Sequence, residues 1–404
     1  FGVVGLPTFY GVGSVVKNVV PAGLYETFME GVVGWVGFFT GLAYVFWGFL
    51  AVVFLIYWFG REEERNLKTA FKTALPVAPF AFTLGILSGV IAWGIAWFIG
   101  PELPDIAVGF VSLGAGLIMA HYNILSPDKS WDFPPSQEWS QLWKGGLNLE
   151  EIIEKPQKQM PVLWAWAPYL LVAFFLLITR LPQLGLGEIL QSYVLTYKDI
   201  LGSGLSFSLK PLYLPGTMPF IPIAVLTAFL YRMKRKEVMG AWKVSLHRVL
   251  PAALTLVIAV SMAQIMIQSY HNPAGISGMM ESLSRMIALG AGKLLPLVSP
   301  WIGALGGFMT GSNTSSNILF STLQYGAAEQ IGISRTVVVA LQSTGGGIGN
   351  LISVLNVAAI AGVVGIVGYE GNILRKTIIP TIIYALVSGV VGMLIIYILA
   401  PGIF

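Results

Sequence analysis

The chain has 404 residues, of which 55% are hydrophobic and 10% charged, with a net charge of +4, a mean hydropathy of +0.77 and no cysteine. A soluble domain carries roughly 25% charged residues, so this chain cannot cover itself with a water-compatible surface. The composition excludes a soluble protein, disulfides and thiolate metal sites, and gives no support for a nucleic-acid partner. It predicts a polytopic membrane protein.

The apolar runs are long and continuous, which is typical of membrane helices of about 20 residues and not of alternating barrel strands. The predicted fold class is therefore all-α, a polytopic transmembrane helical bundle. In chain order we expect spans at 38–59, 76–99, 104–122, 161–179, 217–231 and 249–270, an irregular set between 292 and 368, and a last span near 378–400. Hydropathy leaves open the number of crossings between 271 and 375.

Lys and Arg gather in three hydrophilic segments, residues 60–75, 126–160 and 232–248, each separated from the next by two predicted spans. The positive-inside rule assigns such segments to the cytoplasm. Arg375 and Lys376 then return to the same side, and the C-terminus lies outside. We expect a multi-pass protein of the cell membrane, surrounded by the lipid bilayer.

A run of small polar residues, GSNTSSN, interrupts the apolar sequence at 311–317. Gly311 suits a chain break, and Ser312 is a favoured N-cap residue. From Asn313 onward, helical spacing places mostly polar residues on one stripe, so we expect the stripe to face inward. The stripe consists of Asn313, Ser316, Asn317, Phe320, Ser321 and Gln324. A helix that begins here would present unpaired N–H groups, which bind carboxylates without Arg or Lys.

A second interruption is expected in the run LQSTGGGIGNLIS at 341–353, where Gly345, Gly346, Gly347 and Gly349 favour a broken helix. Two broken helices close in sequence are typical of a secondary transporter, whose site is built from half-helix ends. Single Ser, Thr or Asn residues often only bridge helices. Together with the two breaks, however, they predict a substrate site. The candidate residues are Ser312, Asn313, Thr314, Ser316, Asn317, Gln342, Thr344, Asn350 and Ser353, with Gly311, Gly345, Gly346, Gly347 and Gly349 as the glycines of the breaks.

Charged candidates are few. Glu102 and Asp105, in the run GPELPD, fall in a predicted outside loop, and Glu329 and Arg335 flank a predicted helix–helix turn. The sequence places no carboxylate inside a span. It contains no HExxH or GxSxG motif and its three His residues are scattered, so we expect neither an enzyme nor a metal or cofactor site.

The segment from Thr310 to Ser353 closely resembles the L-lactate permease family of bacterial and archaeal membrane proteins. The runs FIGPELPDI at 98–106, NPAGIS before the polar motif, and VGYEG with LRK after it resemble further landmarks of that family, in the same order. The family is longer at its N-terminus, where a Gly-rich motif similar to EGAAGFG precedes a segment like Phe1–Pro7. We therefore expect an N-terminal portion to be absent from this chain, which begins without an initiator Met.

The resemblance implies an inverted-repeat transporter that imports lactate, and often glycolate, together with a proton. The implied parts are 1–125 as the remainder of the first transmembrane repeat, 126–160 as a cytoplasmic loop, 161–248 as connecting helices, and 249–404 as the second repeat. Some family members carry Asp where this chain has Asn313, and Lys where it has Asn350. Because Asn does not titrate, neither position can carry the proton here.

The predicted function is secondary active import of small 2-hydroxy monocarboxylates, with L-lactate first and glycolate and D-lactate as related substrates, by proton symport with alternating access. The substrate carboxylate is expected near Ser312 and Asn313, and its hydroxyl near Asn317, Gln342, Thr344 or Asn350. One alternative is a sodium-coupled carrier of larger carboxylates, with the carbonyl groups of the broken helices holding the ion. A passive organic-anion channel is a second alternative.

Overall fold

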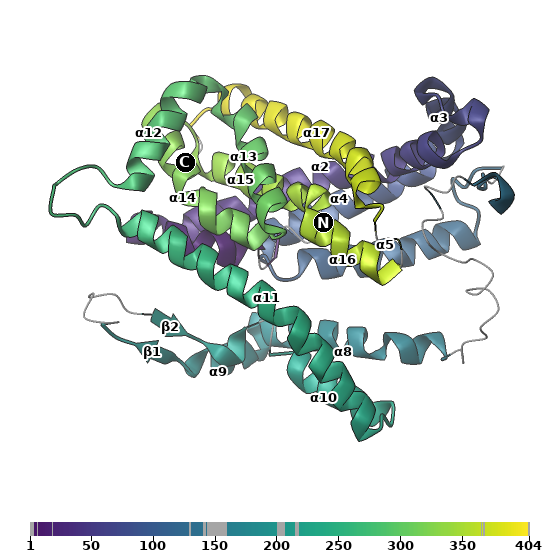
Figure 1. Cartoon of the computed structure of the whole chain (residues 1–404), viewed down its shortest axis with the longest axis horizontal. Coiled ribbons are helices and arrows are strands. Elements are labelled where there is room, and N and C mark those ends of the chain that lie inside the picture. Colours follow the sequence, from purple (N-terminus) through teal and green to yellow (C-terminus); the bar gives the residue numbers. More distant parts are fainter. Residues whose placement is uncertain are drawn as a thin grey trace. The chain divides into compact units, whose positions relative to one another are not determined.

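The computed structural model describes residues 4–5, 7–17, 19–128, 131–139, 143, 160–199, 207–214, 218–364, 366 and 368–402. By its contacts the chain divides into two compact units, residues 1–154 together with 256–404, and residues 155–255. Apart from two short strands, the regular elements among the described residues are helices (Figure 1), which confirms the predicted all-α class. Much of the hydrophilic segment 126–160 lies outside the described residues.

The larger unit is built from long helices joined by single helical turns. Its elements before residue 154 are η1 (Pro7–Val12), α1 (Gly13–Val16), η2 (Ala22–Leu24), α2 (Tyr25–Phe59), η3 (Glu62–Glu64), α3 (Leu67–Ala74), η4 (Leu75–Val77), α4 (Ala78–Phe98), α5 (Pro104–His121) and η5 (Ser136–Glu138). After residue 256 come the end of α11 (Arg235–Gln268), α12 (Met279–Ala291), η9 (Gly292–Leu294), α13 (Leu295–Thr310), α14 (Asn313–Ile331), α15 (Arg335–Gly349), η10 (Asn350–Ile352), α16 (Val354–Val364), α17 (Glu370–Leu394) and η11 (Ile395–Leu399).

The smaller unit contains α8 (Val162–Arg180), η6 (Pro182–Leu184), α9 (Leu186–Ser192), the strands β1 (Leu195–Tyr197) and β2 (Phe207–Leu209), η8 (Pro211–Tyr213), α10 (Phe220–Leu230) and the first part of α11. The strands pair antiparallel, with Thr196 opposite Ser208. The Arg180 guanidinium lies 3.5 Å from the centre of the Tyr213 ring and donates a hydrogen bond to the Tyr213 carbonyl oxygen, so the end of α8 is fixed to η8.

Six helical segments are long and apolar enough to cross a membrane. They are Tyr25–Phe59, Leu67–Phe98, Pro104–His121, Val162–Arg180, Met279–Thr310 and Glu370–Leu399. A bent pair, Arg335–Ile352 with Val354–Ala361, adds a seventh if the two halves count as one span. These segments confirm a multi-pass helical membrane protein. The expected span at 217–231 is only the 11-residue α10, and the one at 249–270 is the second half of α11.

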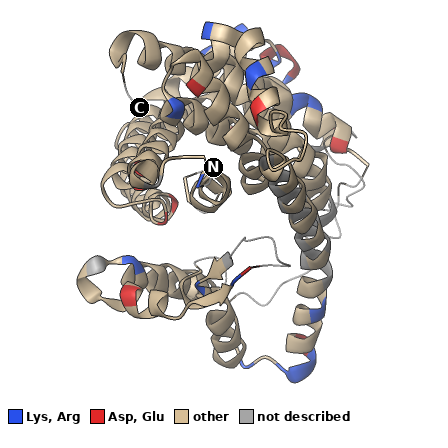
Figure 2. Cartoon of the chain, turned by 90° about the vertical axis from the view of Figure 1, so that its left-hand side faces the viewer, with Lys and Arg blue, Asp and Glu red and all other residues tan. Residues whose placement is uncertain are grey.

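Two cation–ring contacts join residues near the predicted basic segments of the larger unit. The Lys376 ammonium lies 4.2 Å from the centre of the Phe59 ring, and the Arg65 guanidinium 5.0 Å from that of Trp143. Phe59 at the end of α2 therefore lies near the first part of α17, and Arg65 lies near Trp143. Figure 2 shows most Lys and Arg at helix ends and connections, with long stretches of helix free of charge.

Helices α13, α14 and α15 form a tight three-helix cluster. The Ser316 hydroxyl of α14 donates to the Gly303 carbonyl oxygen of α13 over 2.9 Å, while Ser299, near the start of α13, bonds to Gln324, further along α14. Helices α13 and α14 are therefore antiparallel and form a hairpin. Its tip is Gly311, whose left-handed φ of +67° ends α13 one residue before α14 is capped.

Glycines let the backbones of α13 and α15 touch. A methyl group added at Gly345 would overlap the Pro300 carbonyl oxygen, and one at Gly349 would overlap that of Ala304. Helix α15 runs through Gly345, Gly346 and Gly347 without a break. The expectation that these glycines interrupt the helix is therefore wrong. The interruption follows them, at residues 350–353, where α15 passes into η10 and the axis bends by 42° before α16.

We predict that Gly345→Ala destabilises the purified protein in detergent by about 3 kcal/mol, because overpacking against a backbone carbonyl cannot be relieved by a side-chain movement. The readout is thermal unfolding. Gly94→Ala is the matched control, since nothing lies within 4 Å of a methyl group at that helical glycine. Equal melting temperatures for the Gly345→Ala variant and the wild type would contradict the close contact.

Candidate functional site

Helix α14 is polar yet enclosed by protein. Asn313 is 4% exposed, and Ser316, Asn317, Ser321 and Gln324 are fully buried. The polar residues of the predicted stripe are therefore buried, and so are Ile318 and Leu323 on the opposite face of the helix. The cap is also as predicted, because the Ser312 hydroxyl oxygen accepts a hydrogen bond from the Ser315 N–H over 3.3 Å. This bond uses the acceptor side of the hydroxyl and leaves its O–H free to donate.

A chain of side-chain amides holds the cluster together behind the hairpin tip. Gln324 Nε2 donates to Gln342 Oε1 over 2.7 Å, and Gln342 Nε2 donates to Ser316 Oγ over 3.1 Å. Ser316 in turn donates to α13, so three helices share one hydrogen-bond network. Two of the predicted site residues, Ser316 and Gln342, thus already have protein partners and fix the register of the helices.

The N-terminal segment packs on the same helix. Asn317 Nδ2 donates to the Pro7 carbonyl oxygen and to Ser343 Oγ, each over 2.9 Å, and Thr8 Oγ1 shares a 2.9 Å hydrogen bond with Ser343 Oγ. A methyl group at Gly11 would lie 2.9 Å from the Asn317 Cβ atom, so η1 contacts α14 directly. Thr8 was not among the predicted site residues, because its partner lies 335 residues away in sequence.

A cavity of about 620 Å³ opens at the hairpin tip. Its lining residues are Pro7, Gly311, Ser312, Asn313, Thr314, Gly347, Asn350, Leu351, Asn356, Ala359 and Ile360. The structure thus brings the predicted Ser312, Asn313, Thr314 and Asn350 to one cavity. It leaves Ser316, Asn317, Gln342, Thr344 and Ser353 outside its lining, and it adds Asn356, which lies one turn after the second break.

Four helix ends meet at this cavity. Helix α13 ends at Gly311 and α15 ends before Asn350, while α14 begins after Ser312 and α16 begins after Ser353. The starts of α14 and α16 carry unpaired N–H groups and a partial positive charge. None of the described residues that line the cavity has an ionisable side chain. An anion would therefore be held by backbone N–H groups and neutral side chains.

Several buried polar atoms beside the cavity have no protein partner. Both amide atoms of Asn313 are buried and unpaired, as are Asn350 Oδ1 and Ser353 Oγ. Burying such groups without a hydrogen bond costs about 1–3 kcal/mol each. A methyl group on Gly311, at the tip, would lie 3.1 Å from Ser353 Oγ, and one on Gly346 of α15 would overlap Asn313 Oδ1. This arrangement suits a small polar molecule that would complete their hydrogen bonds.

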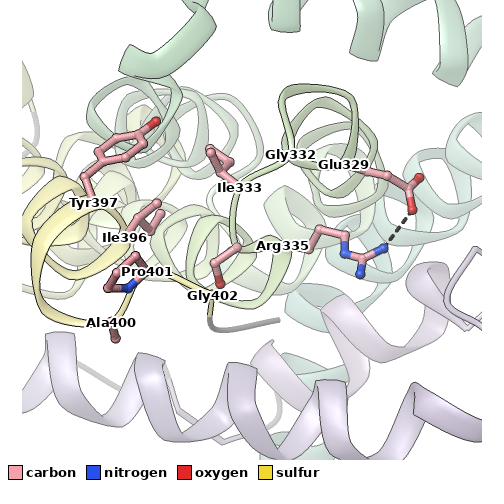
Figure 3. Close-up of a pocket in the computed structure, with 10 residues that line it drawn as sticks. Glu329, Gly332, Ile333, Arg335, Ile396, Tyr397, Ala400, Pro401 and Gly402 are labelled. Atoms are coloured by element: carbon pink, nitrogen blue, oxygen red, sulfur yellow. Dashed lines mark hydrogen bonds and ion pairs between the residues drawn. The ribbon is translucent and has the colours of Figure 1, made fainter.

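A second cavity, of about 530 Å³, lies at the opposite ends of α14 and α15 (Figure 3). Arg335 and Glu329 form a 2.8 Å ion pair across the turn predicted from these two residues, and Arg335 also donates to the Tyr325 hydroxyl. Figure 3 shows the pair on one side of the cavity and Tyr397 across it. The Arg335 and Glu329 charges beside this cavity are already paired with each other. Within the described residues, no three His, Asp or Glu side chains gather to hold a metal ion.

The comparisons with known proteins agree with the resemblance seen in the sequence. A family model described as L-lactate permease matches residues 1–399. A putative L-lactate permease of Haemophilus influenzae is 27% identical over 96% of this chain and 68% of its own length. The glycolate permease GlcA of Escherichia coli is 28% identical over 79% of this chain and 59% of its own.

An L-lactate permease of Bacillus subtilis is 26% identical over 77% of this chain and 58% of its own length. The chain thus spans between 58% and 68% of these three relatives. No solved structure matches it. Because the family model covers nearly the whole sequence, the chain belongs to the L-lactate permease family.

Proposed function

We propose that the protein is a secondary transporter that imports small 2-hydroxy monocarboxylates by alternating access. L-lactate is the leading candidate substrate, and glycolate and D-lactate are related candidates. The observation that carries the proposal is the cavity at the hairpin tip, which is lined by the start of α14 and by Asn313, whose buried amide atoms have no protein partner. The names of the relatives, lactate and glycolate permeases, support the same substrate class.

The carboxylate of the substrate would lie at the start of α14. There it would accept hydrogen bonds from the free N–H groups of the first turn, from Asn313 Nδ2 and from the Ser312 hydroxyl. Hydrogen bonds to a charged group contribute about 1.5–3 kcal/mol each. The substrate hydroxyl would donate to Asn350 Oδ1 or Asn313 Oδ1, which have no protein partner. Together these contacts distinguish a 2-hydroxy acid from an unsubstituted one.

A site without Arg or Lys suits a molecule that must leave again. The partial charge of a helix start contributes about 0.3–1 kcal/mol at an exposed site and up to about 2 kcal/mol when partly buried. A desolvated Arg–carboxylate pair would hold the anion more firmly. The neutral lining therefore favours moderate affinity and fast release, as a carrier needs when its site alternates between the two sides of the membrane.

The two breaks give the site its mobility in this proposal. Half-helices that end at the middle of a membrane can rock as units around a fixed site, because their backbone groups face a cavity instead of lipid. The α15–α16 bend and the α13–α14 tip are the two such positions here. Rocking of these units would expose the cavity first to one side of the membrane and then to the other.

We also propose the orientation that the positive-inside rule predicts, with residues 60–75, 126–160 and 232–248 in the cytoplasm and the C-terminus outside. The ring contacts of Arg65 with Trp143 and of Lys376 with Phe59 support it, since they join the first two segments to each other and the end of α2 to the first part of α17. The division into a first repeat, connecting helices and a second repeat, at residues 125, 160 and 248, belongs to the same proposal.

Coupling to a proton is the mechanism that we propose, and the site residues themselves do not carry that proton. Asn313 and Asn350 have no titratable group. A sodium-coupled carrier remains the alternative, favoured by the unpaired oxygens of Asn350 and Ser353 and by the carbonyl ends of α13 and α15 beside the cavity.

We predict that Asn313→Leu raises the half-saturation concentration for L-lactate about tenfold or more, because it removes a hydrogen bond to a charged group. The measurement is uptake of labelled L-lactate by proteoliposomes that contain the full-length protein. Ser321→Ala is the control, since its hydroxyl is buried on the same helix and does not line the cavity. Unchanged uptake in Asn313→Leu and in Ser312→Ala would refute the site.

We predict that an inside-alkaline pH gradient drives uphill accumulation of L-lactate in the same proteoliposomes. An inward sodium gradient at equal pH should drive none. Liposomes without protein provide the control for passage of the neutral acid through the lipid. Accumulation driven by sodium alone would establish the sodium-coupled alternative, and purely downhill flux under both gradients would establish the channel.

A further inference from the structure

The cavity at the hairpin tip is larger than L-lactate requires. Its volume is about 620 Å³, and pockets of roughly 300–1,000 Å³ enclose ligands of drug size. A water molecule occupies about 30 Å³ in the liquid, and L-lactate has the bulk of only a few water molecules. With L-lactate at the start of α14, most of this volume would be left over. The cavity therefore has room for a larger substituent on the substrate.

The lining of the cavity has a polar and an apolar part. The polar part contains the hairpin tip and the amides of Asn350 and Asn356, and the apolar part contains Leu351 of η10 with Ala359 and Ile360 of α16. Leu351 is 37% exposed and Ile360 is 60% exposed, so other side chains leave much of this aliphatic surface uncovered. Pockets that combine such surface with a few polar groups bind molecules that have a polar and an apolar end.

The aliphatic side chains of α16 lie one helical turn beyond the hairpin tip. Asn356 Nδ2 donates to the Gly311 carbonyl oxygen over 3.1 Å, which places the first turn of α16 at the tip. Ala359 and Ile360 follow Asn356 at the spacing by which helical residues share one face. One turn of helix rises about 5.4 Å. The aliphatic surface of α16 therefore begins about this distance from the polar groups.

A 2-hydroxy acid bound as proposed would direct its third group toward the apolar part. Its carboxylate would lie at the start of α14 and its hydroxyl beside Asn350 or Asn313, so both would occupy the polar part. A carbon–carbon bond is about 1.5 Å long, and the methyl group of L-lactate therefore reaches only a fraction of one helical turn. A branched group of four carbons extends roughly 4 Å and covers most of that distance.

We propose that the site also carries 2-hydroxy monocarboxylates whose aliphatic group is larger than methyl, and that Ala359 and Ile360 set the size it accepts; the proposal rests on transport of 2-hydroxy acids as the function. Ala359 leaves space because its side chain is small, and Ile360 supplies surface for contact. Each CH₂ group removed from water strengthens binding by up to about fourfold. The affinity should therefore rise from glycolate through L-lactate to a branched acid such as L-2-hydroxy-4-methylpentanoate.

The first test measures competition in proteoliposomes that contain the full-length protein. Uptake of labelled L-lactate at equal pH on both sides is inhibited with unlabelled glycolate, L-lactate, L-2-hydroxybutanoate or L-2-hydroxy-4-methylpentanoate. We expect the concentration for half-inhibition to fall about two- to fourfold with each carbon added. Proteoliposomes loaded with the branched acid should also take up labelled L-lactate faster than unloaded ones, because a carried acid exchanges for the external one.

The second test changes the apolar part of the lining. Ala359→Phe should raise the half-inhibition concentration of the branched acid about tenfold relative to that of L-lactate, because the ring fills the space for the larger group. Ala358→Phe is the matched control, since Ala358 is exposed on the same helix and does not line the cavity. Ile360→Thr should weaken the preference for the branched acid two- to fourfold, and it supplies the test if Ala359→Phe does not fold.

Three results would overturn this inference and leave L-lactate transport standing. In the first, the branched acid inhibits uptake no better than L-lactate does. In the second, it inhibits uptake but fails to accelerate it from the inside. In the third, Ala359→Phe and Ala358→Phe shift the ratio of the two half-inhibition concentrations equally, which would assign the effect to the surface of α16 as a whole. A wild type that takes up neither L-lactate nor glycolate would instead overturn the proposed function.

Discussion

A helix that ends inside a membrane leaves backbone N–H and C=O groups that lipid cannot satisfy. In this protein four such ends meet at the tip of the α13–α14 hairpin and the bend between α15 and α16. At these ends Asn313 and Ser353 are buried, and Gly311, Ser312 and Asn350 line the cavity. The hairpin, the glycine contacts and the buried amide network all serve to keep these ends together, so the cavity exists only while the surrounding helices remain packed.

The glycines of α13 and α15 show how packing overrides local preference. Gly345 and Gly349 belong to a continuous helix although glycine is a poor helix former, because only glycine lets that helix rest on the α13 backbone. The sequence alone indicated a break at these residues. Glycine thus has two uses here, close packing of helices at Gly345 and Gly349 and reversal of the chain at Gly311, and only the contacts with α13 distinguish them. At Gly311, where φ is positive, the expectation of a break was correct.

Local features were predictable and distant contacts were not. The cap at Ser312, the burial of the polar residues of α14 and the turn between Glu329 and Arg335 follow from spacing over a few residues, and the structure has all three. The contact of Thr8 with Ser343 joins segments far apart in the chain. No periodicity in one sequence records such a pair, so the position of the N-terminal segment beside α14 required the fold.

One side chain spans both interruptions of the candidate site. Asn356 Nδ2, on α16, donates to the carbonyl oxygen of Gly311 over 3.1 Å and reaches that of Asn350 at 3.5 Å. The hairpin tip and α16 are thereby fastened to each other through a single amide. Any rearrangement that parts them must first release this fastening, while a rearrangement that carries both along together leaves it intact. The amide thus divides the motions open to the protein into those that cost a hydrogen bond and those that do not.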